Sequence, residues 1–154
     1  MAQIYLSRVE SVFGHKADNY RKRSGGRNDL AHQVEYNPDS DIIEIKYSGD
    51  ISLEEVLTAI DDAWELIQLH TCYLVLSDFL NAEIIFEPSR ILEINEKLAA
   101  LDVSKGIRSA VVVPGDEESN RNMQVRLYEL ASGTGGWPAQ MFYSREQALQ
   151  WLRY

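Results

Sequence analysis

Short runs of strand-forming residues alternate with segments of helical periodicity through most of this chain, and that alternation limits the possible fold more than any other feature. Runs at 34–36 and 42–47 are joined by a turn-rich Asn-Pro-Asp-Ser-Asp segment, which is typical of a β-hairpin. Runs at 73–76, 109–113 and 139–143 are separated by helical segments. The sequence therefore predicts an open α/β sheet of four to five strands in the order ββαβαβαβα, mostly parallel after an N-terminal antiparallel hairpin.

Each helical segment has a start signal and an apolar stripe. Ser52 is expected to cap the first helix, with Glu55 reaching back as in a capping box, and Ser144 and Gln147 repeat this pattern for the last helix. A second helix is expected from Pro88, and a third after Asp116. The predicted stripes comprise Leu53, Val56, Leu57, Ile60, Trp64 and Ile67; Ile91, Ile94, Leu98 and Leu101; Met123, Leu127, Leu130 and Ala131; and Ala148, Leu149 and Leu152.

Charge divides the chain near residue 33. Residues 1–33 hold six Lys and Arg against three Asp and Glu, a formal charge of +3, which leaves -12 for the remainder of a chain whose net charge is -9. We therefore expect a basic N-terminal extension with a short helix and a linker, followed by one domain over 34–154. The extension could dock on an acidic partner or an anionic surface, or pack on its own acidic domain.

Composition disfavours several classes of protein. The acidic balance disfavours nucleic-acid binding, and no segment is apolar enough for a secretory signal or an integral membrane span. The single Cys72 allows neither a disulfide framework nor a cysteine-based zinc site and favours a cytoplasmic location. His15, His32 and His70 lack a metal-binding spacing, and no nucleophile elbow is present. We expect a non-enzymatic protein without a cofactor.

The stretch 73–101 holds the strongest site candidates. We expect the strand at 73–76 to end before Ser77 and Asp78, and an apolar Ile84-Ile85-Phe86 loop to lead to Glu87 at the next helix. Polar and apolar groups would then meet beyond the carboxyl end of a strand, where open α/β sheets usually build their sites. Asp78 could position a ligand, or bond the backbone of its own loop. The apolar residues could bind a ligand, belong to the core or form a dimer contact.

Two further groups have both a functional and a structural interpretation. Ser89 in the first turn of the next helix is a candidate phosphorylation site, because free amides would stabilise a phosphate there; alternatively it satisfies those amides itself. Asp116 could bind a partner or a divalent cation, or cap a helix. The acidic residues Glu54, Asp61, Asp62 and Glu65 of the first helix are interpreted as its solvated face.

The chain resembles the SpoIIAA-like proteins, within the wider group of STAS (sulfate transporter and anti-sigma factor antagonist) domains. The resemblance covers about residues 34–154 and rests on the order of the segments 47–55, 74–78, 87–89, 110–113 and 142–152. In the anti-sigma factor antagonists, an acidic residue precedes a phosphorylated serine or threonine at the helix start. Here Glu87 matches the acidic position, Pro88 stands where the phosphoacceptor is expected, and Ser89 follows one residue later.

These observations give three functional hypotheses. The leading one is a non-enzymatic binding or regulatory module of STAS-like type that acts on a protein partner, with a homodimer as a further expectation. The second is a carrier or sensor of a small apolar, lipid-like ligand bound near Ile84, Ile85 and Phe86. The weakest is a divalent-metal-dependent enzyme that uses Asp78 and Asp116.

Overall fold

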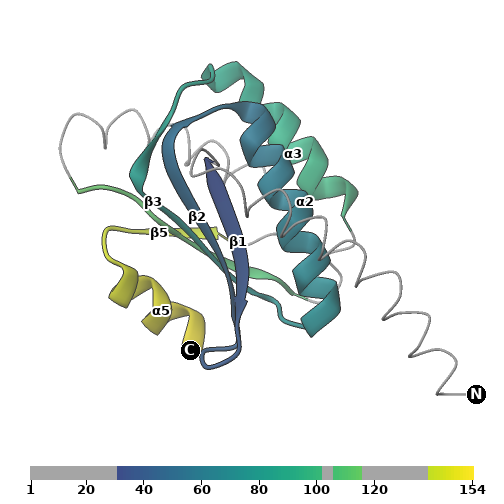
Figure 1. Cartoon of the computed structure of the whole chain (residues 1–154), viewed down its shortest axis with the longest axis vertical. Coiled ribbons are helices and arrows are strands. Elements are labelled where there is room, and N and C mark those ends of the chain that lie inside the picture. Colours follow the sequence, from purple (N-terminus) through teal and green to yellow (C-terminus); the bar gives the residue numbers. More distant parts are fainter. Residues whose placement is uncertain (1–30, 102–105, 116–138) are drawn as a thin grey trace, which may run out of the picture. The chain divides into compact units, whose positions relative to one another are not determined.

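Five described strands form one open sheet. The computed structural model describes residues 31–101, 106–115 and 139–154. Neighbouring strands follow the order of the chain (Figure 1). The first two strands pair antiparallel and the later pairs are parallel, which confirms the predicted open sheet with its N-terminal hairpin. The strands are β1 (His32–Asn37), β2 (Ile42–Ile51), β3 (Leu74–Ile84), β4 (Arg108–Val112) and β5 (Ala139–Phe142).

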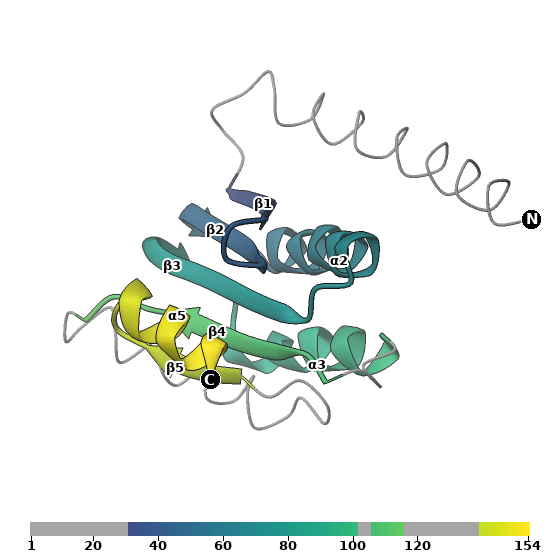
Figure 2. The same cartoon turned by 90° about the horizontal axis from the view of Figure 1, so that it is seen from below.

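Helices cover both faces of this sheet. Helices α2 (Leu53–His70) and α3 (Ile91–Ala100) lie on one face, and α5 (Arg145–Arg153) lies on the other (Figure 2). Under α5, the buried side chains of Ile42, Leu76, Ala110 and Val112 contact Ala148 and Leu152. Successive strand residues point to opposite faces of the sheet. The other buried apolar side chains of the strands therefore face α2 and α3, and with these helices they form the larger core. The predicted helix with Asp116 at its start lies outside the described residues.

The predicted starts of two helices are confirmed, with one correction. The Ser52 hydroxyl accepts a hydrogen bond from the Glu55 amide at 3.3 Å, and the Ser144 hydroxyl accepts one from the Gln147 amide at 3.2 Å. The Glu55 carboxylate contacts the His32 ring and is not the second half of a capping box. The Glu55 carboxylate thus pairs with His32 of the hairpin in place of the Ser52 backbone amide that a capping box would use.

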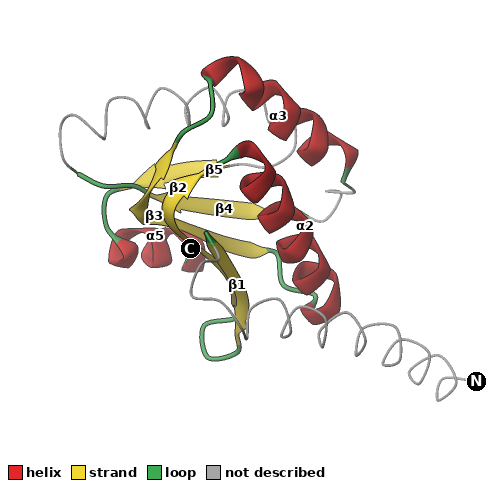
Figure 3. Ribbon diagram, turned by 45° about the horizontal axis from the view of Figure 1, so that its top comes forward, coloured by secondary structure: helices red, strands yellow, loops and turns green. Residues whose placement is uncertain are grey.

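Strand β3 is longer than predicted. It continues through Ser77 and Asp78 to Ile84 and pairs with β2 beyond the last residue of β4 (Figure 3). Opposite Tyr47, β3 carries the extra residue of a bulge, since Lys46 pairs with Asp78 but Ser48 pairs with Asn81. Phe79 enters the core there and stacks on Tyr47 with ring centroids 4.2 Å apart. Ser77 and Asp78 therefore lie inside the strand, flanked by the buried residues Leu76 and Phe79.

The connection after β3 also differs from the prediction. Residues Pro88–Arg90 form a single 3-10 turn, η1, and the α-helix begins at Ile91. The residue before α3 is Arg90, whose side chain makes no capping hydrogen bond. Ile91, Ile94 and Leu98 are buried as the apolar stripe predicted, whereas Leu101 follows the end of α3 and is partly buried.

Candidate functional site

The predicted site residues fall into two separate groups. Ser77 and Asp78 lie in the middle of β3 and, as neighbours in a strand, point to opposite faces of the sheet. Ile84 lies six positions after Asp78, which corresponds to roughly 20 Å of extended chain. The expectation that these polar residues join the apolar loop at a strand end is therefore wrong, because β3 ends later than expected.

Asp78 has a local structural contact. Its carboxylate accepts a hydrogen bond from the Leu80 amide at 2.9 Å, which serves a backbone group at the bulge. This geometry agrees with the interpretation in which Asp78 bonds the backbone of its own segment. Asp116, the proposed second carboxylate of a metal site, lies outside the described residues.

The apolar trio of the connection divides between core and surface. Ile84 is the last residue of β3 and is buried, as is Phe86, while the Ile85 side chain is 57% exposed. The Ile85 amide donates a hydrogen bond to the Ile51 carbonyl oxygen at 3.1 Å, which fixes the connection beside the end of β2. Burial explains two of the three residues without a ligand, and the ligand-carrier hypothesis stays a prediction.

The surface around η1 combines charge with exposed apolar groups. Glu87 and Ser89 are exposed, and the Glu87 carbonyl oxygen accepts a hydrogen bond from the Arg90 amide at 3.0 Å. Leu92, in the first turn of α3, is 62% exposed. We call Ile85, Glu87, Ser89 and Leu92 the η1 surface.

Arg90 and Glu93, which the sequence analysis did not single out, form ion pairs beside this surface together with Glu54. The Arg90 guanidinium lies 3.4 Å from the Glu54 carboxylate, at the start of α2, and 3.3 Å from the Glu93 carboxylate. The Glu54 backbone amide and the Arg90 guanidinium lower the pKa of the Glu54 carboxyl group. Only the Arg90–Glu93 pair, three positions apart on a helix, has a local sequence signal.

The one cysteine, the most reactive nucleophile type in the chain, is buried and hydrogen-bonded. Cys72 is buried, its thiol donates to the Asp41 carbonyl oxygen at 3.1 Å, and burial raises the pKa of the thiol. Within 31–101, 106–115 and 139–154, no cluster of three or more His, Cys, Asp or Glu is arranged to hold a metal ion. None of the helices in those ranges is long and apolar enough to cross a membrane.

A hollow of about 630 Å³ lies on the outer side of α5, away from the η1 surface. The described residues that line it are mostly polar or charged, whereas pockets for small apolar ligands are lined mainly by apolar side chains. This hollow therefore does not supply the site that the carrier hypothesis requires. Its described lining comprises Arg145, Glu146, Leu149, Gln150, Arg153 and Tyr154.

Comparisons with known proteins bear on the fold. No model of a protein family matches the sequence, and no curated protein matches it. Among solved structures, an anti-sigma factor antagonist from Mycobacterium paratuberculosis matches with a TM-score of 0.52 at 15% identity, over 80% of this chain and 93% of that one. The chain has the SpoIIAA-like fold. At this identity the likeness shows the fold alone.

Two further structures match less closely in shape. An uncharacterised protein with a SpoIIAA-like fold from Shewanella loihica has a TM-score of 0.46 at 20% identity, over 79% of this chain and 92% of that one. The Bacillus cell fate determinant SpoIIAA in its phosphorylated form has a TM-score of 0.45 at 15% identity, over 80% of this chain and 100% of that one.

Proposed function

We propose that this SpoIIAA-like protein is a non-enzymatic regulatory module that binds a protein partner through the η1 surface. The observation that carries the proposal is the exposure of Ile85 and Leu92. These two large aliphatic residues lie on either side of η1 in the chain. Isolated exposed apolar residues are ordinary, but two that flank the ion-paired Arg90 in the chain offer apolar anchors for an interface. The fold, shared with an anti-sigma factor antagonist, supports a regulatory role.

The described chemistry supports binding over catalysis. Cys72 is enclosed by the core, and Asp78 serves a backbone amide. The charged groups near the η1 surface pair with one another, so Arg90 is held between two carboxylates and not directed at a reacting atom. Such a network gives a docking surface its shape and its charge selectivity.

The proposal is tested by replacing both exposed aliphatic residues with aspartate. Full-length wild-type protein and the Ile85→Asp/Leu92→Asp variant are used to capture partners from an extract of the native source, and captured proteins are quantified by mass spectrometry. The matched control is Leu69→Asp, which alters an exposed leucine near the C-terminal end of α2. Two central contacts of about 1 to 2 kcal/mol each correspond to a loss of roughly 30-fold or more in affinity.

The expected result is a specific partner that the wild type and the Leu69 variant retain and the double variant loses. Equal recovery with all three proteins would place the interface elsewhere. A hydrolase or transferase activity that disappears in a single carboxylate variant would overturn the non-enzymatic assignment.

Ser89 is the proposed point of regulation on this surface. Its side chain is exposed in η1, next to Arg90, so a kinase could reach it. A phosphate would add about two negative charges beside Glu87 and would alter partner binding through charge repulsion. Phosphopeptide mapping of protein from the native source should find Ser89 modified; if it is always unmodified, this regulatory role is wrong.

A further inference from the structure

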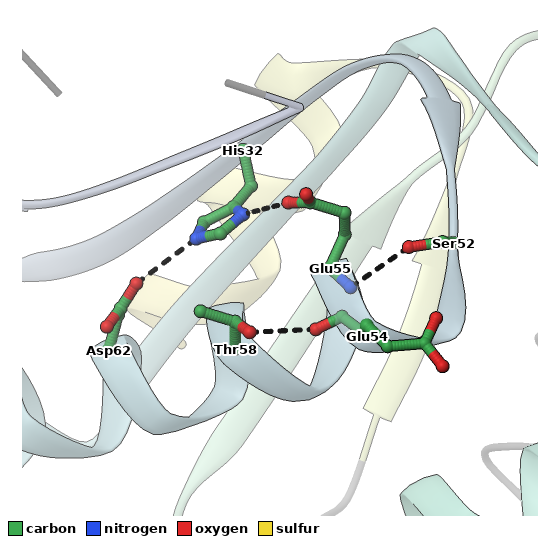
Figure 4. Close-up of polar contacts among 6 residues, drawn as sticks. All are labelled: His32, Ser52, Glu54, Glu55, Thr58 and Asp62. Atoms are coloured by element: carbon green, nitrogen blue, oxygen red, sulfur yellow. Dashed lines mark hydrogen bonds and ion pairs between the residues drawn. The ribbon is translucent and has the colours of Figure 1, made fainter. Parts of the chain in front are cut away.

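A buried histidine connects the first strand to the first described helix. His32, the first residue of β1, is only 6% exposed. Its Nδ1 lies 2.7 Å from Oε2 of Glu55, and its Nε2 lies 3.1 Å from Oδ2 of Asp62 (Figure 4). Both carboxylates belong to α2, and they approach the ring from opposite sides.

This geometry favours a charged ring. An ionised carboxylate can only accept hydrogen bonds, and a neutral imidazole has a single N–H group to donate. With a carboxylate oxygen at hydrogen-bond distance from each ring nitrogen, a neutral ring would place one lone pair against an anion. Both contacts are satisfied together when both nitrogens carry protons, so the geometry favours an imidazolium cation between two anions.

The described groups that face His32 come from two elements. Helix α2 contributes Glu55 and Asp62, and β2 contributes Tyr47, which lies opposite His32 in the antiparallel pairing. Burial and the Glu55 charge raise the pKa of the Tyr47 phenol, so this group stays neutral. The cluster therefore has a net charge of -1 with the ring protonated, and loss of that proton leaves two carboxylates with no cation between them.

We propose that His32, Glu55 and Asp62 form a pH-dependent clamp, which holds the start of β1 against α2 while the ring is protonated and releases it when the proton is lost. Beside this clamp, the Ser48 amide donates to the Ala31 carbonyl oxygen at 2.9 Å. That hydrogen bond reports locally whether the start of β1 remains paired.

The direction of the pH effect follows from the contacts. Burial by itself lowers the pKa of His32, but the hydrogen bonds and charges of Asp62 and Glu55 outweigh it, and the pKa is raised above the ordinary value of 6.5. The stabilisation is thus complete below about pH 6.5, where the unfolded chain is also protonated, and is lost as the pH rises through the folded-state pKa. Each unit by which the folded-state pKa of His32 exceeds the unfolded-state pKa corresponds to a factor of about ten in the folding equilibrium constant.

The first test uses NMR titration of full-length protein labelled with 15N and 13C in histidine. The expected result is a titration midpoint above the ordinary value of 6.5, with both His32 nitrogens protonated below it. A midpoint at or below 6.5 would overturn the proposal. This measurement needs no substitution and does not depend on whether a variant folds.

The second test follows hydrogen exchange of the Ser48 amide across the His32 titration, after correction for the intrinsic pH dependence of exchange. Protection of this amide should fall, by about tenfold or more, as the ring loses its proton. Unchanged protection across the whole titration would show that the charged ring does not act as a clamp.

Matched variants separate the clamp from general charge effects. Glu55→Gln combined with Asp62→Asn should lower the His32 midpoint and remove the pH dependence of Ser48 protection. The control pair, Glu54→Gln with Asp61→Asn, removes the neighbouring carboxylates, which contact Arg90 and Lys97 and not His32. The same midpoint in wild type and the Glu55/Asp62 variant would contradict the proposal, as would an equal shift in the control.

Discussion

The two faces of the sheet are each joined to a helix by one buried charged residue, but the two residues differ in kind. On the α2 face the buried group is the His32 cation, between Glu55 and Asp62. On the α5 face it is the Glu44 carboxylate, 3% exposed and 2.6 Å from the Arg145 guanidinium. A buried charge without a partner is costly, so both helices are fixed in position by charge as well as by apolar packing.

The difference lies in what a change of pH can do to each connection. The ordinary pKa of an imidazole lies near physiological pH and that of His32 is raised from it, whereas a guanidinium keeps its proton throughout this range. The α2 connection is therefore adjustable near the start of the fold, and Arg145 stays charged on the α5 face. One sheet thus combines a helix whose attachment responds to pH with a helix whose cationic anchor does not.

Removing apolar packing should lower the free energy of unfolding most, and by a similar amount on the α2 and α5 faces of the sheet. Ile67 of α2 and Leu152 of α5 are almost fully buried. Ile67→Ala and Leu152→Ala should each lower the free energy of unfolding by about 2 to 5 kcal/mol, through lost burial and the cavity left behind. Urea denaturation followed by circular dichroism measures this. A loss below about 1 kcal/mol on one face only would show that its helix contributes little apolar stabilisation.

Removing the cation of the α5 connection should come next. Arg145→Ala leaves Glu44 buried with its main partner gone and should cost about 2 kcal/mol, less than for a fully buried pair because the Arg145 side chain is partly exposed. Arg153→Ala, an exposed arginine on the same helix, is the control. Adding Glu44→Gln to the Arg145 variant should recover part of the loss. If it recovers nothing, the cost does not come from an unpaired charge.

The helix caps should have smaller and nearly equal effects on the two faces. Ser52→Ala and Ser144→Ala each remove a hydroxyl that accepts a hydrogen bond from an amide three residues on, and should each cost about 1 kcal/mol. Thermal unfolding measures both variants, and replacement with aspartate should preserve stability. A clearly larger loss for Ser52→Ala would indicate that the α2 cap also positions Glu55 for the clamp.

Removing an exposed ion pair should change the free energy of unfolding least, in contrast to the buried ion pairs. The Lys97 amine lies 2.7 Å from the Asp61 carboxylate, between α3 and α2, with the Asp61 side chain largely exposed. Lys97→Ala should cost less than about 1 kcal/mol, and the difference from wild type should shrink in 1 M salt. A loss that equals that of Arg145→Ala would remove the distinction between buried and exposed connections.

The predictions that held from the sequence depend on local signals. The turn residues between β1 and β2, the spacing of Ile91, Ile94 and Leu98, and the serines before α2 and α5 all act over a few residues. The boundaries of β3 were wrong because Ser77 and Asp78 look like a strand end, whereas pairing with β2 and the burial of Phe79 extend the strand. The candidate site was divided for the same reason.

The charged connections had no sequence signal. Asp62 was interpreted as part of a solvated helix face and His32 as part of an N-terminal extension, although the structure places them in contact across 30 positions. Glu44 and Arg145 are 101 positions apart. Nothing in the spacing of such residues indicates a pair, because partners so distant meet only through the register of the sheet and the placement of a helix on it.

By itself, the sequence determined the order of the described strands and helices, the antiparallel hairpin, the serine caps of α2 and α5 and the apolar faces of the described helices. Those features follow from backbone hydrogen bonding and side-chain periodicity, which operate within one element at a time. Only the tertiary structure decided where β3 ends, which apolar residues of the β3–α3 connection remain exposed, and which charges are buried. Burial and pairing depend on residues that the fold brings together from distant parts of the chain, and their free energies arise only once those parts are in contact.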